Sequence, residues 1–447
     1  MRKLYLVVLL SATLHGKNIE TPWMTVFIHG IVRPPLTLST LFSILRDELH
    51  GTTYARTAAI IRRNPFFYQT QPMQDLGLIP ITNHTRDLGA GAWPFMMLFK
   101  NIAEKVGFGT PQDIYYTYGW SGLLSAQHRC AEAQLLHDSL CSEQKKITEK
   151  TGVSPRIRLI GYSHGGSLCL NLELARRKNP ACTPLIVDEL ITIGTPVLRA
   201  SAEYASSKIF KQVYTISSAG DMVQSLEIGS TKFYHNGHFS CGLPPNLTQI
   251  KIRLCDEQET EVVRKKRSRT IRYIRKTLTR MDPGHIEIWA FGWTPSLYRK
   301  NLPIYPLPVG LFIPAIIACV EKNLPCTTFV TCDLRPSTGT ALLSVPCRKR
   351  KRTYSRVPFL DKQYIASLQA QALTYMPHNQ FHAEYDRRVN HLTRLARMQR
   401  LQDYLERKKQ RQQKKVPATC EVCSRVTKSD PWSTVAPATV KAQDQNG

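Results

Sequence analysis

The segment Arg156–Gly166 (RIRLIGYSHGG) constrains the fold more than any other part of the chain. Its first five residues predict a buried β-strand, and the leucine-rich Ser167–Arg177 that follows predicts a helix. Between them, the pattern G-x-S-x-G sets Ser163 among glycines, which permit a turn too sharp for residues with side chains. A strand that turns sharply into a helix indicates an α/β protein in which the serine hydroxyl is exposed at one edge of the sheet.

Other segments rich in β-branched and aromatic residues are also predicted to be strands. They are 24–29, 113–118, 189–193, 212–217 and 249–254. Most are followed by a glycine or a polar turn, and helical patterns lie between several of them; residues 307–320 predict a buried or interfacial helix. Strands that alternate with helices favour a mostly parallel sheet with helices on both faces. Such sheets bind ligands at the carboxyl ends of their strands.

We expect one large α/β domain at 17–345 with an appendage at each end. Residues 1–16 join a basic start to the apolar run 4–14, which is typical of a signal peptide; the alternative is a first buried strand. A signal peptide would make the protein secreted or periplasmic. Residues from about 32 to 91 interrupt the alternation after the first strand, so they are a candidate lid over the active edge or an ordinary pair of helices.

Residues 346–447 are predicted to be a basic, partly helical or disordered tail. The chain holds 60 Lys and Arg against 33 Asp and Glu, a formal net charge of +27, which excludes an acidic solvating protein. The run RKRKR at 348–352 and the helical pattern at 380–415 carry much of the excess, and 264–280 contain basic residues but no acid. The tail could bind an anionic membrane surface or nucleic acid, or be a solvated helix.

A serine hydroxyl becomes a nucleophile when a base takes its proton, and an acid must orient that base. Asp221 follows the predicted strand at 212–217 through a Ser-Ala-Gly turn, so its carboxylate is expected at the carboxyl edge of the sheet with Ser163. Three other acids fit this position less well: Asp188, Asp256 and Asp282.

The candidate base is His285, which follows Pro283 and Gly284 in a loop after the last predicted strand. Such a loop can return the imidazole to Ser163, whereas two other histidines, His235 and His238, precede that strand. The order Ser, Asp, His is the one that this architecture requires. We therefore expect Ser163, Asp221 and His285 to be the catalytic residues.

Two backbone N–H groups are candidates for an oxyanion hole. Ile31 ends the sequence His29-Gly30-Ile31 after the first predicted strand, and His164 follows Ser163 directly. Donors at these places would stabilise the tetrahedral oxyanion formed when the serine attacks a carbonyl. The side chain of His29 is expected to be structural.

These motifs resemble those of α/β-hydrolases of the lipase and esterase type. The resemblance rests on IHGI at 28–31, GYSHGG at 161–166, GTP at 194–196, GD at 220–221 and GH at 284–285. It implies a Ser163–His285–Asp221 triad, acyl-enzyme chemistry, and no metal or organic cofactor. Tyr162 stands where many such lipases have histidine, so the resemblance indicates no subfamily.

The sequence therefore predicts a serine hydrolase that cleaves carboxylic esters, with a small ester or a lipid as substrate. The apolar residues 66–68 and 93–97 could line an acyl pocket or pack in the core. One alternative is a thioesterase or acyltransferase, and another is a basic protein on a hydrolase scaffold that binds nucleic acid or an anionic membrane. Twelve cysteines fit an oxidising compartment, with candidate disulfides among 319–347 and between Cys241 and Cys255.

Overall fold

The computed structural model describes residues 21–32, 49, 51–178, 185–196, 203–221, 239, 244–266, 269–294, 298–346, 352–378 and 380–413. The chain divides into two compact units, Met1–Arg397 and Met398–Gly447. Of the second unit, the described part is the end of one helix, residues 398–413. The predicted signal peptide at 1–16, most of the basic run at 348–352, and His235 and His238 lie outside the described residues.

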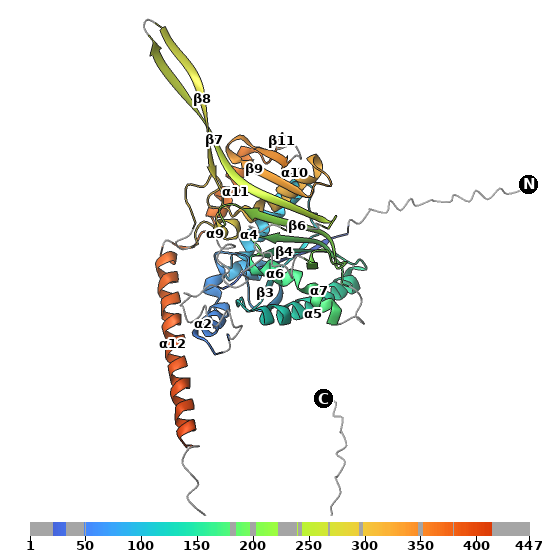
Figure 1. Ribbon diagram of the computed structural model, residues 1–447, viewed down its shortest axis with the longest axis vertical. Coiled ribbons are helices and arrows are strands. Elements are labelled where there is room, and N and C mark those ends of the chain that lie inside the picture. Colours follow the sequence, from blue (N-terminus) through green and yellow to red (C-terminus); the bar gives the residue numbers. More distant parts are fainter. Residues whose placement is uncertain are drawn as a thin grey trace, which may run out of the picture. The chain divides into compact units, whose positions relative to one another are not determined.

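One mixed sheet of eleven strands organises the described residues (Figure 1). Its order is β11-β10-β9-β7-β6-β5-β4-β1-β3-β2, and β8 pairs with β7 beside this path. The strands are β1 (Trp23–Ile28), β2 (Gly77–Pro80), β3 (Ile114–Gly119), β4 (Arg156–Tyr162), β5 (Val187–Ile193), β6 (Phe210–Ser218), β7 (Leu247–Lys266), β8 (Arg269–Met281), β9 (Phe329–Arg335), β10 (Thr340–Pro346) and β11 (Arg352–Pro358).

Helices connect these strands and cover both faces of the sheet. They are α2 (Thr53–Arg62), α3 (Asn83–Asp87), α4 (Ala92–Lys105), α5 (Ala126–Thr151), α6 (His164–Leu170), α7 (Leu172–Lys178), α9 (His285–Trp289), α10 (Ile313–Asn323), α11 (Lys362–Leu373) and α12 (Phe381–Gln413). Short 3₁₀ helices are η1 (Pro65–Tyr68), η3 (Val309–Phe312) and η4 (Pro336–Thr338).

The central part of the sheet is parallel. From β3 through β1, β4, β5, β6 and β7 to β9, every neighbouring pair of strands runs in the same direction. Antiparallel strands extend both ends, β2 beside β3 and β10 with β11 beside β9. The predicted α/β class with a mostly parallel sheet is therefore confirmed, and the carboxyl ends of the parallel strands meet at one edge.

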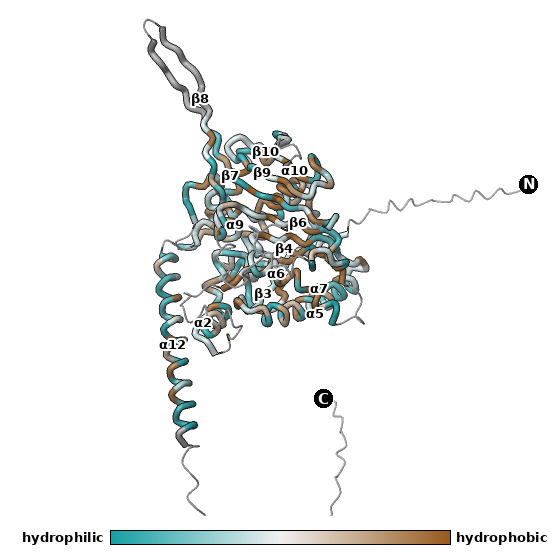
Figure 2. The backbone as a smooth tube through the Cα atoms, in the orientation of Figure 1, coloured by the Kyte–Doolittle hydropathy of each residue, from teal (hydrophilic) through white to brown (hydrophobic). Residues whose placement is uncertain are grey.

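Successive side chains of the strands point to opposite faces of the sheet and pack into two separate cores. In β1, Phe27 packs on the face covered by α4, α10 and α11, whereas Val26 and Ile28 pack on the face covered by α5, α6 and α7. In β4, Ile160 and Leu159 divide between the same two faces. A strand buried on both faces is rich in apolar residues, which is why these strands could be predicted (Figure 2).

The structure differs from the expected tail boundary at 346. Strand β11 pairs with β10 along its whole length, and α11 buries Ile365, Leu368 and Ala372 in the core that also holds α10. Four of the seven residues of β11 (RTYSRVP) are polar or basic, as is typical of an outermost strand. Because of this composition, the sequence analysis placed the segment in the tail and not in the sheet. The first turns of α12 also belong to the core, since Phe381 is buried there.

Two further expectations concern helices and thiols. The buried or interfacial helix expected at 307–320 is present as the buried η3 and α10, whereas the helix expected at 167–177 is divided at Asn171 into α6 and α7. In the part of the chain that the structure describes, no helix is both long and apolar enough to cross a membrane. In the candidate disulfide regions, the described cysteines are free thiols: Cys255, Cys319, Cys326 and Cys332. The other two candidates, Cys241 and Cys347, lie outside the described residues.

Candidate active site

Ser163 occupies a strained turn between β4 and α6. Its φ of 53° and ψ of −131° lie outside the regions that residues with side chains ordinarily adopt. The turn is tied to the next strand, because the N–H of Ser163 donates to the carbonyl oxygen of Ile193 over 2.8 Å. A Cβ atom on Gly165 would lie 2.4 Å from the carbonyl oxygen of His29, so only glycine allows this close approach to β1.

The structure brings Ser163, His285 and Asp221 into one hydrogen-bonded chain. His285 Nε2 lies 3.0 Å from Ser163 Oγ, and His285 Nδ1 lies 2.8 Å from Asp221 Oδ2. With a proton on Nδ1 donated to the carboxylate, Nε2 is left to accept the hydroxyl proton of the serine. The Asp221 side chain is fully buried and that of His285 is 10 % exposed, so the pair is shielded from water.

The acids that fitted less well in the sequence have other partners. Asp188 accepts the backbone N–H of Ile157 over 2.9 Å and contacts Lys211 at the opposite edge of the sheet. The carboxylate of Asp282 is paired with Arg280 at 2.8 Å, although the residue lines the same cavity as Ser163. Asp256 lies in β7 beyond its last contact with β6.

Tyr162 holds the loop that carries His285, a role that was not predicted from the sequence. Its hydroxyl donates to the carbonyl oxygen of His285 over 3.0 Å, and its ring stacks on Trp289 with centroids 5.2 Å apart. Burial, followed by the charge of Asp221, raises the pKa of Tyr162 well above its usual value, so the phenol stays protonated and can donate. The residue before the nucleophile thus fixes the backbone of the base.

Glu287 fixes the other side of the same loop. Its carboxylate, 2 % exposed, accepts the N–H of Gly284 over 2.6 Å and forms an ion pair with Arg299, whose Nε lies 2.6 Å from Oε1. Arg299 also donates to the carbonyl oxygen of Asp282 over 2.6 Å. The turn before His285 is therefore held by an ion pair between residues twelve positions apart, neither of which belongs to a recognisable motif.

The backbone N–H groups predicted for an oxyanion hole belong to residues that line the same cavity as Ser163. These residues are Ile31, after β1, and His164, at the start of α6. The loop after β1 passes so near the serine that a Cβ on Gly30 would lie 2.8 Å from the Cβ of Ser163. Glycine at position 30 is therefore needed for Ile31 to reach the site.

His29 is buried beneath this loop and is structural. Its Nδ1 lies 2.6 Å from the carbonyl oxygen of Gly30, and Nε2 accepts from the backbone N–H of Trp120 over 3.4 Å. Burial, with the nearby charge of Arg62, lowers the pKa of His29 well below its usual value, so the ring is neutral. A neutral ring with one N–H and one acceptor nitrogen satisfies both contacts.

A cavity of about 590 Å³ opens beside the serine. This volume is typical of a site for a small organic ligand. Its wall is largely apolar and includes side chains from several parts of the chain: Tyr54, Ile61, Phe67, Met73, Leu124 and Tyr385. The residues at 93–97 are not among those that line it; Phe95 instead packs in the core against Phe27 and Trp289.

The described part of the insertion, chiefly residues 51–91, supplies much of this wall and is linked to the end of β3. Arg62, at the end of α2, is buried and donates to the carbonyl oxygens of Trp120 and Gln74, each over 2.8 Å. Phe67 in η1 packs edge-on against Tyr385 of α12, with centroids 5.2 Å apart. The cavity therefore depends on the insertion and on the first turns of α12, which were assigned to the tail.

No family model and no curated protein matches this chain. Among solved structures, an esterase from Pyrobaculum calidifontis has a TM-score of 0.22 and 14 % identity and covers 52 % of this chain, which spans 57 % of the esterase. Phospholipase PlaB from Legionella pneumophila, in complex with thio-NAD, has a TM-score of 0.22 and 13 % identity, with 75 % of this chain and 67 % of that chain covered. These similarities are too weak to carry a functional argument.

Proposed function

We propose that this protein is a serine hydrolase that cleaves carboxylic esters through an acyl-enzyme. The observation that carries the proposal is the chain of contacts from Ser163 Oγ to His285 Nε2 and from His285 Nδ1 to Asp221. A serine on a strained strand-to-helix turn, a base within hydrogen-bond distance and a buried acid behind the base are the three parts that nucleophilic catalysis by serine requires.

In the proposed first step, Ser163 Oγ attacks the ester carbonyl carbon while its proton passes to His285 Nε2. The carbonyl oxygen becomes an oxyanion, and Asp221 stabilises the imidazolium that forms. His285 then gives the proton to the leaving alcohol as the carbon–oxygen bond to that alcohol breaks. Water attacks the acyl-enzyme by the same proton path and releases the acid and the free serine.

The backbone N–H groups of Ile31 and His164 are the proposed donors to the oxyanion. Their residues line the cavity beside Ser163, and the glycine at 30 lets the first of them approach. Removal of one such donor costs about 3–4 kcal/mol of transition-state stabilisation in a well-studied serine protease. Because the donors are backbone groups, their positions do not depend on which ester is bound.

The proposed substrate is an ester with an apolar acyl group. Phe67, Ile61 and Met73 give the cavity a largely apolar wall, which favours a hydrocarbon chain over a charged or sugar-like group. The insertion that contributes these residues is the proposed lid, and Arg62 links it to Trp120, directly after β3. Lipids and simple fatty esters share this chemistry.

The test is labelling with a fluorophosphonate probe, followed by mapping of the adduct and measurement of p-nitrophenyl ester hydrolysis. We expect the adduct on Ser163, and we expect Ser163→Ala to lose both labelling and hydrolysis while its circular dichroism and urea unfolding stay unchanged. A matched control is Ser139→Ala on α5, which lies on the surface and bonds to a backbone carbonyl. Hydrolysis by Ser163→Ala at the rate of the intact protein would overturn the proposal.

A further inference from the structure

Strands β7 and β8 continue beyond the sheet as a two-stranded arm. The contacts of β7 with β6 end at Ile252, and those with β9 end at Leu254. From Cys255 to Lys266, the described ladder of β7 is with β8. Figure 1 shows this hairpin, residues 255–281, extending away from the rest of the sheet; we call it the basic arm.

The basic arm carries nine Lys and Arg against four Asp and Glu, and its four acids all lie in β7 at 256–261. The stretch 264–280 contains nine Lys and Arg and no acid. The register pairs Lys266 with Arg269 and Arg264 with Ile271, and the next two pairs are Val263 with Arg272 and Val262 with Tyr273. Cationic residues are thus interleaved with apolar and aromatic residues along the last rungs of the ladder.

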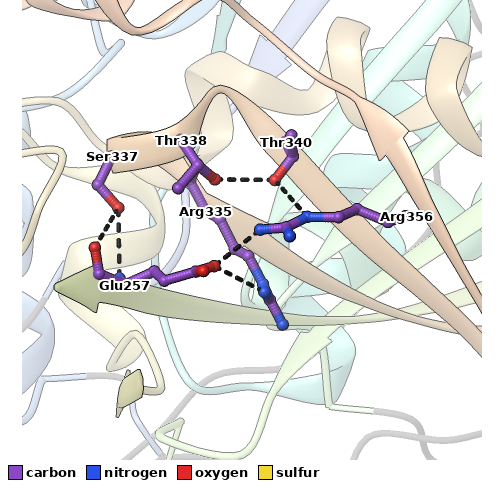
Figure 3. A network of polar contacts seen from close by, with 6 residues as sticks. All are labelled: Glu257, Arg335, Ser337, Thr338, Thr340 and Arg356. Carbon is purple, nitrogen blue, oxygen red and sulfur yellow. Dashed lines mark hydrogen bonds and ion pairs between the residues drawn. The ribbon is translucent and has the colours of Figure 1, made fainter. Parts of the chain in front are cut away.

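The root of the arm is fixed to the sheet by a network of polar contacts (Figure 3). The carboxylate of Glu257 accepts from Arg335 over 2.9 Å and from Arg356 over 2.7 Å, while its backbone N–H donates to Ser337 Oγ over 3.3 Å. Although burial alone would raise the pKa of Glu257, the two arginines lower it, so the ion pairs are intact at neutral pH. The arm therefore leaves the sheet in a defined direction.

The basic arm leaves from the same edge of the sheet as the candidate active site. β7 runs parallel to β4 and β6, whose carboxyl ends lead to Ser163 and Asp221. The return strand β8 ends at Met281, four residues before His285. By contrast, β10 is antiparallel to β9 and carries the chain to the opposite edge before the basic run at 348–352.

We propose that the basic arm docks the protein on an anionic lipid bilayer, with the active-site edge facing that surface. This goes beyond the proposed function, because binding does not require catalysis. Cationic side chains attract anionic headgroups, and the apolar residues between them suit the boundary between headgroups and acyl chains. Nucleic acid would satisfy the charge equally, but the bilayer is the anionic surface that also suits the largely apolar cavity at the same edge.

The test is co-sedimentation of the intact protein with phosphatidylcholine vesicles that contain or lack phosphatidylserine. The arm variant neutralises four described positions with strand-forming residues: Arg264→Thr, Lys265→Thr, Lys266→Thr and Arg269→Thr. The control variant replaces the basic residues at 348–351 by threonine and so removes the same charge. Ser163→Ala, measured in parallel, keeps binding separate from catalysis.

We expect the intact protein and Ser163→Ala to bind the anionic vesicles alike, with affinity that falls steeply as salt is added. The arm variant should lose on the order of a hundred-fold or more in affinity, because each charge near the surface adds to binding. The control variant should keep its affinity, and both variants should hydrolyse a soluble ester like the intact protein.

A second variant covers the case in which the arm variant fails to fold. Gln258 and Thr277 face each other in the ladder, so replacement of 259–276 by Asn-Gly closes a shorter hairpin above the Glu257 contacts. This variant should also lose vesicle binding. Unchanged binding by both arm variants, an equal loss in the control variant, or tighter binding of a duplex oligonucleotide than of anionic vesicles at equal salt would each overturn the proposal.

Discussion

Replacement of Tyr162 by phenylalanine isolates the contact that holds the backbone of the candidate base. The change removes the hydroxyl that donates to the carbonyl oxygen of His285 over 3.0 Å, while the ring stacking on Trp289 is kept. The carbonyl left without this donor costs about 1–3 kcal/mol of folding free energy. The loop keeps its second anchor, the contact of Gly284 with Glu287 at 2.6 Å.

Because one anchor remains, we expect the imidazole to shift by a fraction of an ångström. Misplacement by about 1 Å can cost a hundred-fold in rate, so kcat for ester hydrolysis should fall about tenfold while KM changes little. Urea unfolding gives the stability of the same sample. Phosphonate labelling of Ser163 should slow by the same factor as kcat, because it depends on the same base.

The matched control is Tyr118→Phe. Tyr118 is also buried and donates to a backbone carbonyl, that of Glu132, over 3.1 Å, but it packs on the opposite face of the sheet. Tyr118→Phe should lose similar folding free energy and keep kcat. Equal kcat values for the two variants would refute the positioning role of the Tyr162 hydroxyl.

Three further predictions follow from the geometry of the site. Gly30→Ala places a Cβ 2.8 Å from that of Ser163 and should lower kcat more than tenfold. In the control Gly152→Ala the new Cβ has nothing within 4 Å, so this variant should change stability alone. Equal kcat values in both variants would contradict the close approach of the loop at Gly30 to Ser163. Tyr385→Ala removes part of the cavity wall and should shift preference toward longer acyl esters in a p-nitrophenyl series. Burial, with the charge of Arg62, lowers the pKa of His29, so its contribution to stability is complete above about pH 6.5 and falls below it by about 1.4 kcal/mol per pH unit. His29→Asn should reduce the slope of unfolding free energy against pH by about one proton, and an unchanged slope would count against a neutral buried ring.

Strands buried on both faces could be predicted because such strands are rich in apolar residues. The apolar residues around Ile160 and Ile191 lie on both faces of their strands, and glycine marks the turns that follow. Strands β8 to β11 lack this pattern. β8 holds basic residues at every few positions, and most residues of β11 are polar or basic. The pairing of these strands therefore depends on neighbouring strands, which cannot be identified from their own sequence.

The same distinction applies to the candidate site. Ser163, Asp221 and His285 each follow a turn at a predictable edge, so topology alone brought them together as expected. Glu287 and Arg299 could not be predicted, because an ion pair formed across a loop leaves no periodic pattern. The sequence showed that Tyr162 stands where many lipases have histidine. Its hydrogen bond to the carbonyl oxygen of His285 could be identified from the structure alone.

The register of the basic arm has a consequence for how its length can vary. Inserting or deleting one residue in each strand at matching positions keeps the remaining cross-strand pairs. A change in one strand alone shifts the register by one residue, and because successive residues point to opposite sides, the side chains beyond it then face the wrong side. The base of the hairpin is held by Glu257, and the segment leading to His285 is held by Asp282 and Glu287. Related chains or engineered variants should therefore tolerate longer or shorter hairpins that grow in matched pairs at the tip, with the histidine undisturbed.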